Sequence, residues 1–410
     1  MKILHAADLH IDSPLHGLSR YEGAPVESLR LASRGALQNL VDLALMLPVG
    51  AVLLAGDIYD GDWRDYQTGL FFSGQMSRLR QAGIPVYLVS GNHDAKNRTM
   101  KGLRLPENVN VLDTAEPQTI RNENAGLAVH GQGFARWDLT ENLAAEYPLR
   151  DSGLFNVGLL HTALTGNPDH GKYAPCEVDD LVGKGYDYWA LGHIHARKVV
   201  TQEPWIVFPG NLQGRNAREI GPKGCTVVTV DGNLRVLSVE HHDLDVARWE
   251  HLIVDVSAAT DHEYALDLVQ AAMRELPDDR LHAVRVTLTG RTPAHRQLWQ
   301  RQVQMIAELR NVANDFGNLW MEKLHVGTCS EHIPSPGLAG VLADLQRTAA
   351  DLGADPDRLM QMINDTPLMR AALPAQARGR HRVEPDNVDW VRRIGDEALE
   401  LLESLLMESR

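Results

Sequence analysis

Apolar residues recur along this chain in two alternating patterns. Short runs rich in β-forming residues indicate buried strands, and longer stretches with apolar residues every three or four positions indicate amphipathic helices. The predicted helices span 27–47 and 66–82 and end at Pro48 and Gly83. The first three strands are expected at residues 2–7, 51–55 and 86–90. This alternation predicts a sheet with helices on its faces.

After residue 108 the strand pattern predominates. These runs predict a second sheet packed on the first. They are residues 109–112, 126–130, 155–160, 186–191, 205–208, 225–230 and 234–239. We therefore expect residues 1–243 to form an α/β domain, a two-sheet β-sandwich flanked by helices.

The rest of the chain divides into two further parts. Residues 245–330 are expected to form a small α/β capping domain, with strands at 251–256, 283–289 and 319–326 and helices at 261–276 and 293–312. A proline-rich linker at 334–337 precedes a helical, partner-binding tail at 336–410. In this tail we predict helices at 338–352 and 386–410, an N-cap at Asp355 and a basic loop at 374–385.

Composition excludes several classes of protein. No apolar run approaches the roughly 18 residues that span a bilayer, so no membrane association is expected. Three dispersed cysteines, and no room for a signal peptide before Asp8, predict a cytoplasmic protein. The net charge of −14 argues against a free-standing nucleic-acid binder, because phosphate affinity comes mostly from Lys and Arg.

Polar clusters follow five of the predicted strands. Polar side chains at the carboxyl ends of strands gather at one edge of an α/β sheet. One such cluster alone would be weak support for a site, but five in succession are a specific signal. Their residue types are those of a two-metal phosphoesterase centre. The clusters are Asp8 with His10, Asp57 with Asp60, Asn92 with His93 and Asp94, His161 alone, and His193 with His195.

These side chains favour particular ions. A bridging carboxylate would hold two ions about 3.5–4 Å apart, and Asp57 is our candidate. Mixed imidazole and oxygen donors suit manganese, iron or zinc better than calcium or magnesium. Two divalent cations beside only Asp8 and Asp57 leave a centre with positive charge that attracts an anionic phosphodiester. We expect two divalent metal ions.

The order of these motifs resembles the calcineurin-like metallophosphoesterase superfamily. The matching motifs are Asp8-x-His10, Gly56-Asp57-x-x-Asp60, Gly91-Asn92-His93-Asp94, His161 and Gly192-His193-x-His195. Two further stretches, residues 3–15 and 208–215, resemble its DNA-repair exonuclease branch, the YhaO and SbcD nucleases.

This resemblance implies a role for each residue. Asp8, His10 and His195 would bind one metal, and Asn92, His161 and His193 the other, with Asp57 shared. His93 would be catalytic without binding metal, and Asp94 would orient its ring. Asp60 is expected to support the loop or the ligands from outside the metal shell.

Other residues near these motifs are open to two interpretations. Asp12 and His16 either line the substrate groove or have no role in it. Asn211 and Arg215 either contact a substrate phosphate or belong to a plain turn. His5 is expected to be a packed core residue, and His130 to support the site from outside.

The resemblance implies a manganese-dependent DNA nuclease. The family's usual activities are exonucleolytic cutting of duplex DNA and endonucleolytic cutting of single strands, in DNA repair, with an SMC- or ABC-like coiled-coil ATPase as partner. The alternatives are a phosphodiesterase or phosphatase on small nucleotides, and a regulatory scaffold subunit of the ATPase. About 165 residues beyond the first domain favour a macromolecular substrate, and the complete ligand set argues against a scaffold. A homodimer is left open.

Overall fold

The computed structural model describes most of the first 330 residues and isolated stretches beyond them. The described residues are 1–15, 18, 23–60, 66–96, 104–164, 173–330, 340, 343–345, 347–348, 351, 355–365 and 395. The predicted linker at 334–337 and the basic loop at 374–385 lie outside them. So do the predicted tail helices at 338–352 and 386–410, apart from residues 340, 343–345, 347–348, 351 and 395, which are helical.

The chain forms two compact units, which are described separately. The first comprises Met1–Ile253, Gln270–Thr287 and Ile306–His325, and the second comprises Val254–Val269, Leu288–Met305 and Val326–Arg410. In the described part of the chain, no helix combines the length and apolarity needed to cross a membrane.

The first sheet has six strands in the order β12-β11-β1-β2-β3-β4. Strands β1 to β4 run parallel to their neighbours, and β11 and β12 are added antiparallel. The strands are β1 (Lys2–Ala6), β2 (Val49–Ala55), β3 (Val86–Val89), β4 (Val109–Val111), β11 (Gly224–Val230) and β12 (Val236–Asp243). The strands predicted at 2–7, 51–55 and 86–90 are present. The runs at 109–112, 225–230 and 234–239, which the apolar pattern assigns to the second sheet, belong to this sheet instead, because β4 pairs with the edge of β3 and β11 with the edge of β1.

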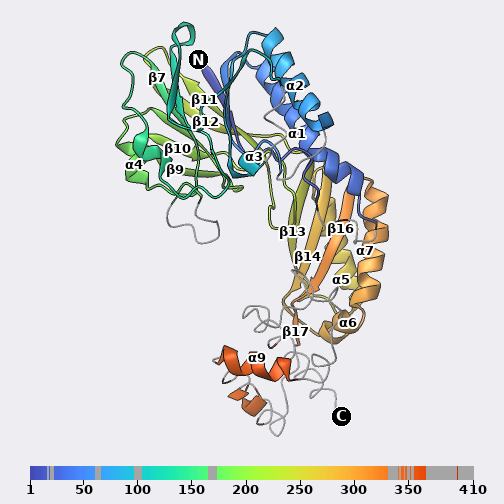
Figure 1. The fold of residues 1–410 in the computed structure, drawn as a ribbon. Helices are drawn as coiled ribbons and strands as arrows, with labels where there is room; N and C mark the ends of the chain where they lie inside the picture. Colours follow the sequence, from blue (N-terminus) through green and yellow to red (C-terminus); the bar gives the residue numbers. More distant parts are fainter. Residues whose placement is uncertain are drawn as a thin grey trace. The chain divides into compact units, whose positions relative to one another are not determined.

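Helices α1 (Val26–Met46) and α2 (Tyr66–Gln81) lie side by side against the outer face of this sheet (Figure 1). The apolar stripe that predicted α1 is its buried face, since Leu29, Ala36 and Leu40 are almost fully buried. The helix ends where Leu47 adopts an extended conformation before Pro48, the conformation that a following proline favours.

The second sheet has the order β5-β6-β7-β8-β10-β9. Strands β6, β7, β8 and β10 are parallel, and the two edge strands are antiparallel. The bounds are β5 (Gln118–Asn122), β6 (Leu127–Gly131), β7 (Phe155–His161), β8 (Tyr188–Gly192), β9 (Lys198–Gln202) and β10 (Trp205–Phe208). Both edge strands are polar, and the apolar pattern did not predict them.

The two sheets enclose a common core. Side chains of β1 alternate between its two faces. Ile3 and Ala7 therefore pack in this core, while Leu4 packs toward the helices. The second sheet contributes Val157 and Tyr188 to the same core. Each fully buried valine, leucine or isoleucine side chain stabilises the fold by about 1.5–3 kcal/mol. The predicted α/β sandwich flanked by helices is confirmed.

A three-stranded sheet, in the order β13-β14-β16, follows in the chain. Its strands are β13 (Ala247–Asp255), β14 (Leu281–Thr289) and β16 (Leu319–Val326). Helix α5 (His262–Arg274) lies between the first two, as predicted. The single helix predicted at 293–312 is two helices, α6 (His295–Gln300) and α7 (Gln302–Phe316), because the backbone leaves helical geometry at Arg301.

The remaining described elements are short. Strands β15 (Arg291–Thr292) and β17 (Cys329–Ser330) pair with each other in the second unit. The amide of Arg358 donates to Asp355 at 3.1 Å, so the N-cap predicted for α9 (Pro356–Asn364) is present. The others are α3 (Asn92–Lys96), α4 (Val178–Val182) and the 3₁₀ turns Glu123–Ala125 and Leu143–Glu146.

Candidate metal centre

The five polar clusters meet at one edge of the sandwich. Asp8, Asp57 and Asn92 follow the carboxyl ends of β1, β2 and β3, which are parallel neighbours. His161 ends β7, and His193 follows its parallel neighbour β8. The two sheets therefore bring the seven predicted ligands together.

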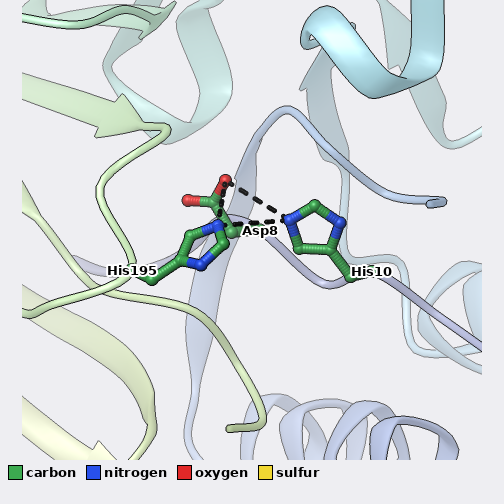
Figure 2. A group of neighbouring side chains, drawn as sticks. All are labelled: Asp8, His10 and His195. Atoms are coloured by element: carbon green, nitrogen blue, oxygen red, sulfur yellow. Dashed lines mark hydrogen bonds and ion pairs between the residues drawn. The ribbon is translucent and has the colours of Figure 1, made fainter. Parts of the chain in front are cut away.

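Asp8, His10 and His195 form a first group of side chains that could hold a metal ion (Figure 2). The two imidazole Nε2 atoms lie 3.3 Å apart. Oδ1 of Asp8 lies 3.7 Å from Nε2 of His195 and 4.0 Å from Nε2 of His10. Figure 2 shows these three side chains pointing toward one another, Asp8 and His10 from the segment after β1 and His195 from the segment after β8.

A second group lies around His161. Its Nε2 is 3.0 Å from Oδ1 of Asn92 and 3.4 Å from Oδ2 of Asp57. The His193 ring lies edge-on to the His161 ring, with centroids 5.2 Å apart. Oδ2 of Asp57 is also 3.9 Å from Nε2 of His10. Asp57 therefore faces both groups, the position that a bridging carboxylate needs.

Hydrogen bonds fix which nitrogen of two rings carries the proton. Nδ1 of His161 lies 2.9 Å from the carbonyl oxygen of Ala55, and Nδ1 of His195 lies 2.9 Å from the carboxylate of Glu219. Because these oxygens only accept, each Nδ1 donates and each Nε2 presents its lone pair to the centre. Such outer partners are typical of metal-bound histidines.

The donor set fits divalent cations. Oδ1 of Asp8 is buried and, among the described residues, accepts no hydrogen bond. Burial raises the pKa of Asp8. For Asp57, burial would also raise the pKa, but the positive charge that His161, His10 and His93 carry when protonated outweighs it and lowers the value to about 2. Buried carboxylates are costly unless a positive charge compensates them. The neighbouring nitrogen lone pairs supply no such charge, whereas a bound cation would.

The backbone at this edge is strained. Non-glycine residues rarely adopt positive φ, yet Asp8 (φ 51°), His10 (42°), Asp57 (51°) and His193 (104°) all do so. Residues in such conformations persist where surrounding structure imposes them, and they cluster at functional sites. Gly91 is needed for a different reason, since a Cβ there would collide with the Asp57 carboxylate.

His93 is partly exposed, at 32%. Its Nδ1 lies 2.8 Å from Oδ1 of Asp60. Burial lowers its pKa, but Asp60 and Asp57 outweigh burial, and the net shift is upward. Asp60 also accepts from Ser13 at 2.6 Å and from Arg215 at 3.3 Å. Asp60 is therefore the carboxylate that orients the His93 ring.

The orienting role predicted for Asp94 is wrong. Its two carboxylate oxygens accept hydrogen bonds from the backbone amides of Ile58, Tyr59 and Gly91, at 3.0–3.2 Å. Burial and the charge of Asp57 raise its pKa to about 7. Asp94 thus holds two site loops together instead of contacting the neighbouring ring.

Two family models match this chain. The family model "Calcineurin-like phosphoesterase" matches residues 1–197, and "Metallophosphoesterase YhaO, middle domain" matches residues 249–329. An uncharacterized metallophosphoesterase YhaO of Bacillus subtilis (strain 168) is 35% identical over 299 residues, which are 72% of this chain and 72% of that protein. The chain belongs to the YhaO family of calcineurin-like metallophosphoesterases.

The chain is also similar to more distant proteins. The DNA double-strand break repair protein Mre11 of Sulfolobus acidocaldarius is 21% identical over 322 residues, covering 75% of this chain and 80% of that protein. Among solved structures, TT1561 of Thermus thermophilus aligns with 59% of this chain and 98% of its own, at 16% identity and a TM-score of 0.35. The resemblance inferred from the motifs is confirmed at the level of the family.

One loop of this YhaO-family chain, residues 211–223, surrounds His195; we call it the bracket loop. The carboxylate of Glu219 accepts from Nδ1 of His195, and the ammonium group of Lys223 donates to the His195 carbonyl at 3.0 Å. Burial would raise the pKa of Glu219, but the His195 hydrogen bond and the charge of Arg215 hold it well below its usual range. Sequence reasoning missed Glu219 and Lys223, because neither lies in a motif.

Two of the residues predicted to contact substrate, Asp12 and Asn211, bind other side chains of the protein. Asp12 is ion-paired with Arg34 at 2.5 Å and accepts from Thr68. Asn211 is fully buried, and its amide donates to Gln213 and Glu219. These contacts hold the loops together, and any contact with substrate stays a prediction. His16 lies outside the described residues.

Arg215 joins the two carboxylates that support the site histidines. Its guanidinium lies 3.3 Å from Asp60 and 3.5 Å from Glu219. Asp60 contacts the His93 ring and Glu219 the His195 ring. The Arg215 guanidinium therefore links the two carboxylates that contact the His93 and His195 rings. Its predicted contact with a substrate phosphate stays a prediction.

His5 and His130, which the sequence places near the motifs, lie outside the candidate metal centre. His5 is fully buried, with Nδ1 2.9 Å from the Tyr188 hydroxyl and Nε2 3.2 Å from the Leu191 carbonyl oxygen. His130 is hydrogen-bonded to Thr119 and Asn156. The core role predicted for His5 is confirmed.

Proposed function

We propose that this YhaO-family protein is a manganese-dependent DNA nuclease that hydrolyses phosphodiesters with two metal ions. The observation that carries the proposal is the pair of donor groups that share Asp57. Asp8, His10 and His195 stand on one side of this carboxylate, and Asn92, His161 and His193 on the other.

Each group would hold one ion. When bound, the two ions would supply positive charge to the phosphate and make a water molecule acidic enough to attack phosphorus near neutral pH. His93 contributes the protein's own proton chemistry. Because Asp60 engages its Nδ1, the Nε2 atom is the nitrogen left to donate a proton to the leaving oxygen.

DNA is proposed as the substrate on grounds of kinship and size. The relative from S. acidocaldarius is named as a DNA double-strand break repair protein, and its similarity extends over 75% of this chain, well beyond the ligand motifs. We propose both duplex exonuclease and single-strand endonuclease activity, in a cytoplasmic DNA-repair setting. A small nucleotide would not need the residues beyond the first domain.

We also propose the division of labour within the chain. Residues 1–243 would be the nuclease domain, 245–330 a capping domain, and 336–410 a tail that binds an SMC- or ABC-like coiled-coil ATPase. Such a partner would supply cationic surface to a protein whose own net charge is −14.

The test is a set of parallel assays on metal-stripped protein reloaded with Mn²⁺ or Mg²⁺. The substrates are linear duplex DNA, a single-stranded oligonucleotide, a cyclic nucleotide and bis-p-nitrophenyl phosphate. We expect cleavage of both DNAs in Mn²⁺, far weaker activity in Mg²⁺ and none after chelation.

The other outcomes identify the alternatives. Efficient cleavage of the cyclic nucleotide, with neither DNA cut, would establish a small-nucleotide enzyme. A protein that binds two ions but hydrolyses none of the four substrates would be a scaffold. Full activity in Mg²⁺ would overturn the metal assignment.

A further inference from the structure

An exposed tryptophan stands beside the catalytic edge. Trp137 is 46% exposed, although indole rings of this size are usually well buried. The ammonium nitrogen of Lys96 lies over its ring, 4.5 Å from the centroid. This cation–π contact holds the ring in place while leaving much of its surface in solvent.

Two attachments place Trp137 close to the metal centre. Lys96 is the last residue of α3, a five-residue helix whose first two residues are Asn92 and His93. An α-helix rises about 1.5 Å per residue, so Lys96 lies about one turn, or roughly 6 Å along the axis, from Asn92. The tryptophan is thus attached to the helix that carries the proposed catalytic histidine.

The second attachment comes from Phe134, three residues earlier. Its ring is buried and lies edge-on to the His161 ring, with centroids 5.6 Å apart. Its amide donates to the carbonyl of Ser90 at 2.9 Å, and the Ser90 hydroxyl donates to the Phe134 carbonyl at 3.1 Å. The segment 134–137 therefore runs from the second ligand group to the surface.

The cation next to the indole ring suits a nucleic acid strand. Among the described residues, Lys96 forms no ion pair with a carboxylate, so its ammonium group is available to a phosphate. Arg136, by contrast, is engaged by Asp138 at 3.4 Å and Glu141 at 2.7 Å. An aromatic face next to a cation is the combination by which proteins bind single strands, through base stacking and phosphate contact.

We propose that Trp137 and Lys96 form a stacking site for an unpaired nucleobase next to the scissile phosphate. The proposal rests on the nuclease function proposed above and names its substrate feature, a single-stranded segment. The base stacks on the exposed indole surface, and Lys96 contacts the adjoining phosphate. No bond is made or broken at this site.

The experiment compares the full-length protein with Trp137→Ala, Trp137→Phe and Trp137→Leu. The probes are a fluorescein-labelled thymidine oligonucleotide and the same oligonucleotide with abasic positions around the cut. Binding is measured by anisotropy with EDTA present, and cleavage with Mn²⁺. Leu149→Ala is the matched control, because Leu149 is also exposed (71%) but lies by the start of β7, at the opposite end of that strand from His161.

We expect Trp137→Ala to weaken oligonucleotide binding and kcat/KM by roughly tenfold or more. Trp137→Phe should retain most of the affinity, and Trp137→Leu should not, since it is apolar but cannot stack. On the abasic oligonucleotide, the differences between wild type and variants should largely vanish. Melting temperatures identify any variant that fails by unfolding, and Trp137→Phe then decides the question.

The outcomes separate this proposal from the nuclease proposal. Oligonucleotide binding that depends on Trp137, without any cleavage, would refute the nuclease and support the stacking site. Cleavage that is equal in wild type and Trp137→Ala would refute the stacking site alone. If Trp137→Ala lost the same affinity for the intact and the abasic oligonucleotide, Trp137 would act only by holding its loop in shape. That result would also overturn the proposal.

Discussion

Oε1 of Glu219 lies 2.9 Å from Nδ1 of His195, and this contact fixes the ring whose other nitrogen faces Asp8. Glu219 is largely buried and also accepts from the side chain of Asn211 at 2.8 Å. A carboxylate behind a metal-binding histidine orients the ring and makes it a stronger donor. Glu219 is therefore a positioning residue of the first metal group.

We predict that Glu219→Ala lowers the affinity for Mn²⁺ by about 10- to 100-fold, as losses of such partners typically do. Activity should return at high Mn²⁺ concentration, because the ligands themselves remain. Glu219→Gln should be milder, since its amide oxygen still accepts from the ring. The readout is a Mn²⁺ titration by calorimetry with a parallel activity curve. An unchanged titration in Glu219→Ala would assign this carboxylate a purely structural role.

A second prediction separates metal binding from chemistry. His93→Ala should lose about 10²-fold or more in turnover while both ions stay bound, because general acids typically contribute this much. Asp57→Ala should lose the ions themselves, since its carboxylate faces both groups. Elemental analysis after desalting measures the ions, and single-turnover cleavage measures the chemistry. Should His93→Ala lose one ion, His93 would have to be a ligand.

A third prediction concerns His5 and the pH dependence of stability. Desolvation lowers the pKa of His5 to about 3, despite the hydrogen bond to the Leu191 carbonyl. Its unfolded pKa is near 6.5. The unfolded state therefore binds the proton first as pH falls, and stability is lost between about pH 6.5 and pH 3, by at most about 1.4 kcal/mol per pH unit.

This linkage can be measured without the metals. Urea unfolding of metal-stripped protein at pH 7.5, 6.0 and 5.0 should show a steeper loss of unfolding free energy for wild type than for His5→Gln. All other ionisable groups are the same in both proteins, so the difference in slope isolates His5. Parallel pH curves for the two proteins would show that His5 gains a proton without cost.

The fourth prediction concerns the tail. Deleting residues 336–410 should leave a folded, metal-binding phosphodiesterase that still cleaves bis-p-nitrophenyl phosphate. The deletion should abolish co-purification with the coiled-coil ATPase and weaken action on long duplex DNA, because an apolar helix face would dock in a groove of that partner. An insoluble truncation would indicate that the tail folds back on this chain. A soluble one that retains the ATPase would exclude the tail as the docking site.

The sequence predicted what depends on local pattern. The first strands and helices follow from hydrophobic period, and the metal centre follows from polar residues just after strands. The edge strands β5 and β9 escaped prediction because they lie half in solvent, as Gln118 and Lys198 illustrate. An edge strand packs on fewer neighbours, so its sequence carries a weaker apolar signal.

The roles of outer residues depend on tertiary contacts that no motif encodes. Asp94 follows His93 in sequence, but consecutive helical residues point about 100° apart, and its carboxylate meets backbone amides instead. Asp60 reaches the same ring from another loop. Glu219 lies 24 residues beyond His195, and only the fold brings the two together.

Gln213 connects the bracket loop to the start of β13. Its amide oxygen accepts from Val246 at 3.0 Å, and its amide nitrogen donates to the carbonyl of Ala247. The indole of Trp249 donates to the Gly214 carbonyl at 3.2 Å. A pull on β13 would therefore be transmitted through this loop to Glu219 and His195. Force applied to β13 would therefore weaken the binding of the ions. By the same coupling, bound ions would make β13 harder to detach.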